Sequence, residues 1–161
     1  MIYKSYYEIG NGFRIGNDRK HAVNDVQREI LLECIKHLTP DEMALFRITS
    51  TTRPTDVFGF HRNGHAIDIA CDTLPLMIKL YDAMIADSWP GGIAVASLGL
   101  PLHVHIDSRH LVDKGNGKKW PACYFLEQSM AGGAIYPVKQ VNPAQYQQYF
   151  AEIRKIYGAT E

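Results

Sequence analysis

Two short stretches of the chain concentrate histidine and aspartate, the residue types that bind metals and transfer protons. Residues 60–68 read FHRNGHAID, and residues 102–107 read LHVHID. In an extended strand, side chains at alternate positions point to the same face. His103, His105 and Asp107 should therefore share one face, while the aliphatic residues between them pack into the core. We expect this strand to form the floor of a site.

The residue types in these two stretches suit a hydrolytic zinc centre. Such a centre has three protein ligands and leaves the fourth position to water. His61, Asp68 and one of His103 or His105 supply that set, and two neutral imidazoles with one carboxylate leave a positive charge that acidifies the water. The remaining histidine, or Asp107, is then available as a general base.

A plainer interpretation exists for each histidine and each stretch. A lone histidine is most often a surface group or a hydrogen-bonded core group, and we interpret His21, His37 and His110 in this way. His65 is either a second-shell residue or a surface residue. A polar strand face is also common on a solvent-facing sheet, but two such stretches in one small chain favour a shared site.

The surrounding pattern predicts an α+β domain. Spacings of three and four residues between apolar positions predict helices over about 21–38 and from 72 to the Trp89-Pro90 break, and Asn142-Pro143 should start a last helix that extends to about Tyr157. A hairpin is expected within residues 1–20, strands over 45–52, 66–70, 93–96, 102–107 and 123–126, and a polar loop over 111–121. We therefore expect a small antiparallel sheet with helices packed on one side, in a single domain that spans residues 1–161.

Composition narrows the classes of partner and the compartment. The chain has 17 basic and 17 acidic side chains, whereas a nucleic-acid partner would normally require a basic excess. No apolar run approaches the roughly 18–20 residues that span a bilayer, and the amino terminus lacks the apolar centre of a secretory signal. We expect synthesis in the cytoplasm and no membrane partner. Cys34, Cys71 and Cys123 are widely spaced, which predicts free thiols.

The motif HxxGxAxD at residues 61–68, followed by a strand that carries His105, resembles the zinc D-Ala-D-Ala carboxypeptidase and endopeptidase family. That family includes the L-alanyl-D-glutamate endolysins of phages and the hedgehog signalling domain. Its upstream Ser-Gly-Tyr-Arg stretch corresponds to residues 50–53 here, where Ser50 and Arg53 match and the two middle residues do not. The similarity covers residues 48–109, less than half of the chain.

The resemblance implies a role for each matching residue. His61, Asp68 and His105 would bind one zinc ion, Arg53 would stabilise the oxyanion, and His103 would act as the general base. Two positions depart from the pattern. Leu102 stands where some members carry an acidic base, and Gly59 stands where many relatives carry a serine. Ser50, His65 and Asp107 are then expected in the second shell or near the substrate.

The implied activity is hydrolysis of an amide bond in the stem peptide or cross-link of peptidoglycan. A member without a signal peptide would act at the cell wall after release through a pore during phage lysis, or as part of a virion during wall penetration. Two alternatives remain open. The chain could be a phage virion or tail module that retains the peptidase fold, or a zinc hydrolase with a different substrate.

Overall fold

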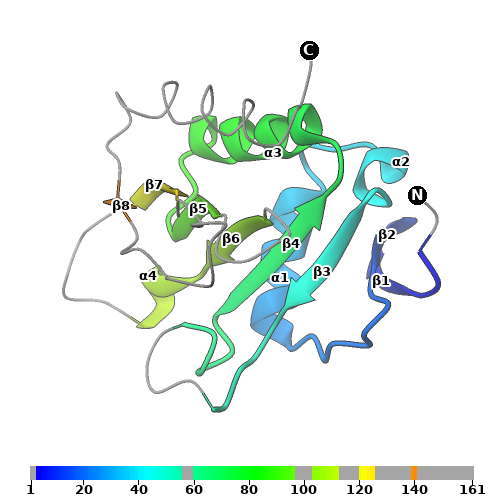
Figure 1. Cartoon of the computed structure of the whole chain (residues 1–161), viewed down its shortest axis with the longest axis horizontal. Coiled ribbons are helices and arrows are strands. Elements are labelled where there is room, and N and C mark those ends of the chain that lie inside the picture. The colour runs from blue at the N-terminus through cyan, green and yellow to red at the C-terminus, as the bar shows by residue number, and fades with distance from the viewer. Residues whose placement is uncertain (1–2, 56–59, 97–102, 113–119, 126–138, 141–161) are drawn as a thin grey trace, which may run out of the picture.

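A computed structural model describes residues 3–55, 60–96, 103–112, 120–125 and 139–140. Its strands form one eight-stranded sheet in the order β1-β2-β3-β4-β6-β5-β7-β8, which runs from β1 and β2 at the right of Figure 1 to β7 and β8 at the left. The strands are β1 (Tyr6–Gly10), β2 (Phe13–Gly16), β3 (Phe46–Ser50), β4 (Ala66–Cys71), β5 (Gly92–Ala96), β6 (His103–Asp107), β7 (Trp120–Phe125) and β8 (Lys139–Gln140). The helices are α1 (Asp25–Cys34), α2 (Pro40–Met43), α3 (Leu74–Ala86) and α4 (Arg109–Val112).

The predicted α+β class is confirmed, and the sheet is antiparallel at its centre. Strands β3, β4, β6 and β5 pair antiparallel in that order. The sheet as a whole is mixed, because β2 pairs parallel with β3 and β5 pairs parallel with β7. Both parallel pairs are joined by long connections that include other elements, and such crossovers are what parallel pairing requires. The expected antiparallel pairing therefore holds for the central strands and at β1–β2 and β7–β8, and it does not hold for β2–β3 and β5–β7.

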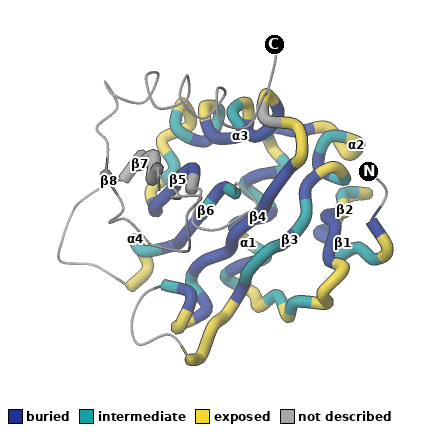
Figure 2. Tube along the Cα trace, in the orientation of Figure 1, coloured by how far each residue is buried: buried dark blue, intermediate teal, exposed yellow. Residues whose placement is uncertain are grey.

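The two long helices cover one face of the sheet. Helices α1 and α3 both contact β4 and also contact each other, so they lie on the same side. Under them, the alternate residues Ile67 and Ile69 of β4, and Val104 and Ile106 of β6, are fully buried in one hydrophobic cluster. Figure 2 shows burial concentrated in these central strands and exposure in the outer loops. The residues between these aliphatic side chains therefore face the opposite side of the sheet.

A capping box fixes α1 against the start of β4. The side chain of Asn24 accepts a hydrogen bond from the backbone of Gln27, whose side chain bonds back to Asn24. The same Gln27 amide donates to the carbonyl of Ala66 (3.0 Å), while Asn24 Nδ2 donates to the carbonyl of Gly64 (2.9 Å). Gly64 has φ +72°, and a Cβ there would lie 2.4 Å from Asn24 Nδ2. Glycine is thus needed where the residue 60–64 turn meets the helix.

Most expected elements are present, with shifted ends. The hairpin within residues 1–20, the helices near 21–38 and 72–88, and the strand pair of 93–96 with 102–107 all form. Two short helices were not expected. Thr39-Pro40 follows the first helix and also starts α2, because Thr39 and Glu42 form a second capping box. Helix α4 ends inside the start of the expected polar loop. The expected last helix lies outside the described residues. Cys34 and Cys71 are free, and Cys123 lies in β7, where only the backbone is described.

Among the described helices, none is long and apolar enough to cross a membrane.

Candidate metal centre

The register of the central strands brings the two histidine–aspartate stretches together. Asp68 of β4 is the direct partner of His105 of β6, and Ala66 is the partner of Asp107. Directly paired residues on one sheet face have Cβ atoms about 4.5–5.5 Å apart. The turn before β4 adds His61, which is buried, with 5% of its surface exposed. Two strands and one turn thus place three metal-binding side chains on the face away from α1 and α3.

Three atoms of these side chains converge on one point. Asp68 Oδ1 lies 3.1 Å from His61 Nε2 and 2.9 Å from His105 Nδ1, and the two ring nitrogens are 3.2 Å apart. No other group of three or more His, Cys, Asp or Glu side chains in the described parts of the chain could hold a metal ion in this way. We call His61, Asp68 and His105 the triad.

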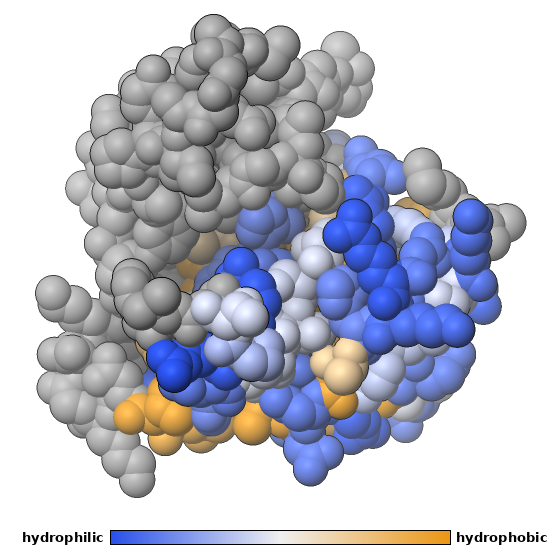
Figure 3. Space-filling view, turned by 60° about the horizontal axis from the view of Figure 1, so that its bottom comes forward, coloured by the Kyte–Doolittle hydropathy of each residue, from blue (hydrophilic) through white to orange (hydrophobic). Residues whose placement is uncertain are grey.

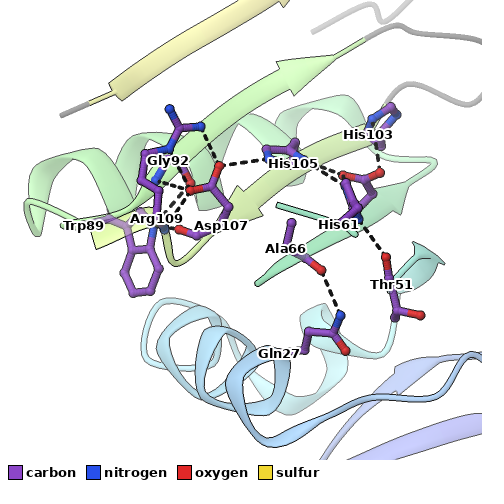
Figure 4. A network of polar contacts seen from close by, with 11 residues as sticks. Gln27, Thr51, His61, Ala66, Trp89, Gly92, His103, His105, Asp107 and Arg109 are labelled. Carbon is purple, nitrogen blue, oxygen red and sulfur yellow. Dashed lines mark hydrogen bonds and ion pairs between the residues drawn. The ribbon is translucent and has the colours of Figure 1, made fainter. Parts of the chain in front are cut away.

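Each histidine of the triad has its second ring nitrogen occupied. His61 Nδ1 bonds to the carbonyl oxygen of Thr51 at 2.7 Å. His105 Nε2 bonds to Asp107 Oδ2 at 3.0 Å. Because a carbonyl oxygen and a carboxylate only accept hydrogen bonds, each bond favours the tautomer whose lone pair points to the convergence point (Figure 4). Histidine ligands of metals are oriented by such partners in most known sites.

Asp107 is the centre of the supporting network. Its side chain is fully buried and accepts hydrogen bonds from Arg109 Nη2 (2.6 Å), Arg109 Nε (2.8 Å) and the backbone N–H of Gly92 (2.9 Å). Burial alone would raise the pKa of Asp107, but the bonds from Arg109 and then His105 outweigh it and lower the pKa. Asp107 is predicted either behind a ligand or near the substrate, and the structure places it behind a ligand. Its carboxylate contacts His105 and does not reach the convergence point.

Hydrogen bonds within and around the triad shift the pKa values of Asp68 and His105 in opposite directions. Burial alone would raise the pKa of Asp68, but hydrogen bonds from His105 and His61 outweigh it and lower the pKa. Burial alone would lower the pKa of His105, but its bonds to Asp107 and Asp68 raise that pKa to about 9. Without a metal, the centre is therefore held together by a protonated imidazole between two carboxylates. A divalent cation could replace that proton.

The donor set and its geometry fit zinc. Two imidazoles and one carboxylate are the ligands of a catalytic zinc centre with an open fourth position. Tetrahedral zinc with bonds of about 2.0–2.1 Å keeps neighbouring ligand atoms about 3.3 Å apart, and the triad atoms are separated by 2.9–3.2 Å. Once His105 has lost its proton, a small outward movement of the side chains is enough to admit the ion, because the two ring nitrogens and the carboxylate oxygen already face one another.

His103 and Ser50 lie beside the triad. His103 Nε2 is 3.9 Å from Asp68 Oδ2, on the same strand face as His105. Ser50 is the register partner of Asp68, because a bulge between Ile48 and Ser50 shifts the pairing by one residue. Without that bulge, Ser50 would lie on the face of Ile48, toward the core. The structure thus brings both residues to the edge of the candidate centre.

Arg53 and His65 flank the turn that carries His61. The backbone N–H of Arg53 donates to the carbonyl of His61 (3.0 Å), and the Arg53 side chain is exposed. The carbonyl of His65 accepts from the backbone of Ser108 (2.8 Å), and His65 Nδ1 is buried without a hydrogen-bond partner among the described residues. Both residues hold the turn in place through their backbones, while the roles predicted for their side chains stay predictions.

Four residues of the network were not anticipated from the sequence. The carbonyl of Thr51, the guanidinium of Arg109 and the small size of Gly92 all support the triad. A Cβ at Gly92 would lie 2.4 Å from Asp107 Oδ2 and 2.5 Å from two Arg109 nitrogens. Trp89 donates its indole N–H toward the carbonyls of Gly92 and Asp107, both at 3.2 Å. In the sequence, the Asp-x-Arg spacing of residues 107–109 is a signal that could have indicated the pairing of Arg109 with Asp107.

Comparisons with protein-family models, with curated proteins and with solved structures gave no significant match for this chain. The chemistry of the site and the motifs in the sequence are therefore what indicate a function for this chain.

Proposed function

We propose that this chain is a zinc-dependent peptidase that hydrolyses an amide bond in the stem peptide or cross-link of peptidoglycan. The observation that carries the proposal is the convergence of His61, Asp68 and His105 with both second imidazole nitrogens already bonded. The class of reaction follows from this donor set. The class of substrate follows from the resemblance of residues 48–109 to the D-Ala-D-Ala peptidase family, because the geometry of a zinc site does not by itself determine the substrate.

When bound, zinc supplies a Lewis acid for the scissile carbonyl and lowers the pKa of a water molecule. The chain supplies the other functions. His103, 3.9 Å from Asp68, accepts the proton of the attacking water and returns it to the leaving amine. Arg53 offsets the negative charge that develops on the carbonyl oxygen. Asp107 keeps His105 in the tautomer that leaves Nδ1 free to bind the metal.

A phage context suits the proposal. The family that residues 48–109 resemble includes phage endolysins, and the chain would then act at the cell wall as a lysis enzyme released through a membrane pore or as a hydrolase carried by a virion. A second candidate, a virion or tail module that keeps the fold without turnover, is favoured by one observation. The net charge of zero offers no general electrostatic attraction to an anionic cell wall, so the chain would depend on a partner for targeting.

The test is mass spectrometry of purified muropeptides digested by the wild-type chain and by His105→Ala, with bound zinc measured in both. A matched control is His21→Ala, which removes a histidine outside the network. We expect cleavage at one type of bond by wild type and control, and neither zinc nor cleavage with His105→Ala. Equal cleavage in excess chelator would refute the proposal. Stoichiometric zinc without cleavage of any muropeptide would favour the structural module.

A further inference from the structure

A second candidate site lies on the other side of the sheet, where α1, the end of α3 and α4 meet. These elements enclose a groove of about 480 Å³, a volume typical of ligand-binding clefts. None of the triad residues lines it. Its apolar surface includes Val26 of α1, Met84 of α3, Leu111 of α4, and Trp89, which lies between α3 and β5. The groove therefore lies apart from the triad, although it shares Trp89 with the network around Asp107.

The charged residues along the groove are all acidic apart from two histidines. Asp25, Glu29 and Glu33 follow one side of α1, and Asp87 follows α3, with no lysine or arginine in the lining. Lys36 pairs with Glu33 (2.7 Å) and His37 with Asp87 (3.2 Å). Asp25 and Glu29 are exposed and form no ion pair with any residue that the structure describes. In a chain with no net charge, this is a local excess of negative charge.

The opposite side of the groove is apolar and partly open. Leu111 is 52% exposed, and its neighbour Val112 is 48% exposed. Large exposed apolar side chains are few in the described parts of the chain, and two of the three lie in α4. Figure 3 shows apolar side chains gathered in a strip along the lower edge of the surface it displays, beside hydrophilic ones. At the groove itself, the exposed Leu111 stands opposite the carboxylates of α1, so an apolar side and an acidic side face each other.

The spacing of the carboxylates selects the shape of the ligand. Residues four apart on a helix are separated by about 6 Å along its axis, so Asp25 and Glu29 present their charges at that interval. Alternate side chains of an extended peptide are separated by about 6.6–6.8 Å. A peptide with lysine or arginine at alternate positions could therefore meet both carboxylates, and its intervening apolar side chains would face Leu111. A small amine would meet only one of them.

We propose that this groove binds an extended basic segment of a partner protein, with cationic side chains on Asp25 and Glu29 and apolar side chains on Leu111 and Trp89. Such a contact would hold the chain on a larger assembly while the opposite face of the sheet stays free. The inference does not depend on the metal centre, since it concerns a different face and a different class of ligand.

The test is isothermal titration of the full-length chain with a short amidated peptide that alternates lysine and leucine. Two comparison peptides replace either the lysines with glutamates or the leucines with glycines. The Asp25→Asn/Glu29→Gln variant removes the two unpaired charges, and Glu8→Gln/Asp41→Asn removes two exposed charges elsewhere. The chemical shift of the Trp89 indole N–H reports whether the peptide enters the groove.

We expect the lysine–leucine peptide to bind most tightly and to shift the Trp89 resonance. Exposed ion pairs contribute about 0.2–1 kcal/mol each, so Asp25→Asn/Glu29→Gln should weaken binding about two- to thirtyfold, and Glu8→Gln/Asp41→Asn should not. Leu111→Ser, at an exposed position, should weaken binding as well, because it removes an apolar contact and no charge.

Three results would overturn the proposal. The first is no binding of the lysine–leucine peptide, and the second is equal binding of the glutamate peptide or of Asp25→Asn/Glu29→Gln when that variant is folded. The third is concentration-dependent self-association of the wild-type chain that the same variant abolishes. That last result would assign the groove to a second copy of the chain.

Discussion

The substitution Asp107→Asn tests whether the supporting network determines metal affinity. The Asp107 carboxylate receives two donors at Oδ2, namely His105 Nε2 (3.0 Å) and Arg109 Nη2 (2.6 Å). Three donors converge on Oδ1, namely the backbone N–H groups of Gly92 and Arg109 and Arg109 Nε, at 2.8–3.1 Å. An asparagine has one acceptor oxygen, and the three donors hold it at the Oδ1 position. Its NH₂ group then faces the Nε2–H of His105, and no hydrogen bond forms because both groups are donors.

The magnitude follows from what His105 loses. Its Nε2–H no longer has an acceptor, so the tautomer with a free lone pair on Nδ1 is no longer favoured. Loss of such an orienting partner typically lowers metal affinity ten- to a hundredfold, which is about 1.4–2.7 kcal/mol. The folded state is also weakened, because Arg109, buried apart from 16% of its side chain, loses its charged partner.

The assay is competition for zinc between the protein and a chromophoric chelator, with folding followed by circular dichroism. Asp72→Asn is the matched control, because Asp72 also pairs with an arginine (Arg47, 2.7 Å) but lies outside the network. We expect the loss of affinity in Asp107→Asn alone. Unchanged zinc affinity in a folded Asp107→Asn protein would refute the reasoning that Asp107 orients His105.

Four further outcomes are expected. Asp68→Ala should abolish stoichiometric zinc binding, measured by elemental analysis, because it removes one of three ligands and leaves only the two imidazoles. His103→Ala should keep zinc but lower muropeptide cleavage about 10²–10⁴-fold, the usual contribution of a general base; loss of zinc in this variant would instead make His103 a ligand. The affinity of the metal-free protein for zinc should rise about tenfold per pH unit up to about pH 9 and then level off. The reason is that the ion displaces the proton of His105, whose pKa is raised to about 9. A zinc affinity that does not change between pH 6 and 9 would contradict this. Gly64→Ala should lower the free energy of unfolding by more than Gly12→Ala, because both positions have positive φ but only Gly64 approaches another side chain within 4 Å; equal losses in thermal unfolding would show that the contact with Asn24 is unimportant.

The same pKa shift predicts the pH dependence of folding in the metal-free protein. The folded-state pKa of His105 is raised above its ordinary value of 6.5, so its contribution to stability is full below about pH 6.5. That contribution should decline as the pH rises through about 9. Thermal unfolding of the metal-free chain across this range is the measurement, and stability that rises from pH 7 to pH 9 would contradict the prediction.

The strand that carries the site was predictable from its sequence, because its period is unambiguous. Val104 and Ile106 alternate with His103 and His105, and one face must enter the core. Once β4 and β6 are both strands with the same kind of alternation, their pairing can bring Asp68 opposite His105. The role of the aliphatic residues as core and of the polar residues as a site face therefore followed from local pattern alone.

The residues that hold the triad in place were less predictable, because they act through backbone groups and depend on how strands far apart in the sequence pair. The carbonyl of Thr51 bonds His61, and every residue has a carbonyl, so no sequence signal singles it out. The position of Ser50 depends on a bulge, which shifts one strand by a residue without a glycine to mark it. The two parallel pairings at β2–β3 and β5–β7 depend on which strands become neighbours, and local periodicity carries no information about this.

X-ray absorption spectroscopy of the zinc-loaded chain would show whether His61, Asp68 and His105 hold a zinc ion, as we propose. We predict one zinc per chain in four-coordinate geometry, with two imidazole nitrogens and light oxygen ligands at about 2.0–2.2 Å. The imidazole scattering should vanish together with the bound zinc in the His61→Ala/His105→Ala variant. A sulfur shell at about 2.3 Å, or zinc retained by that variant, would contradict the account.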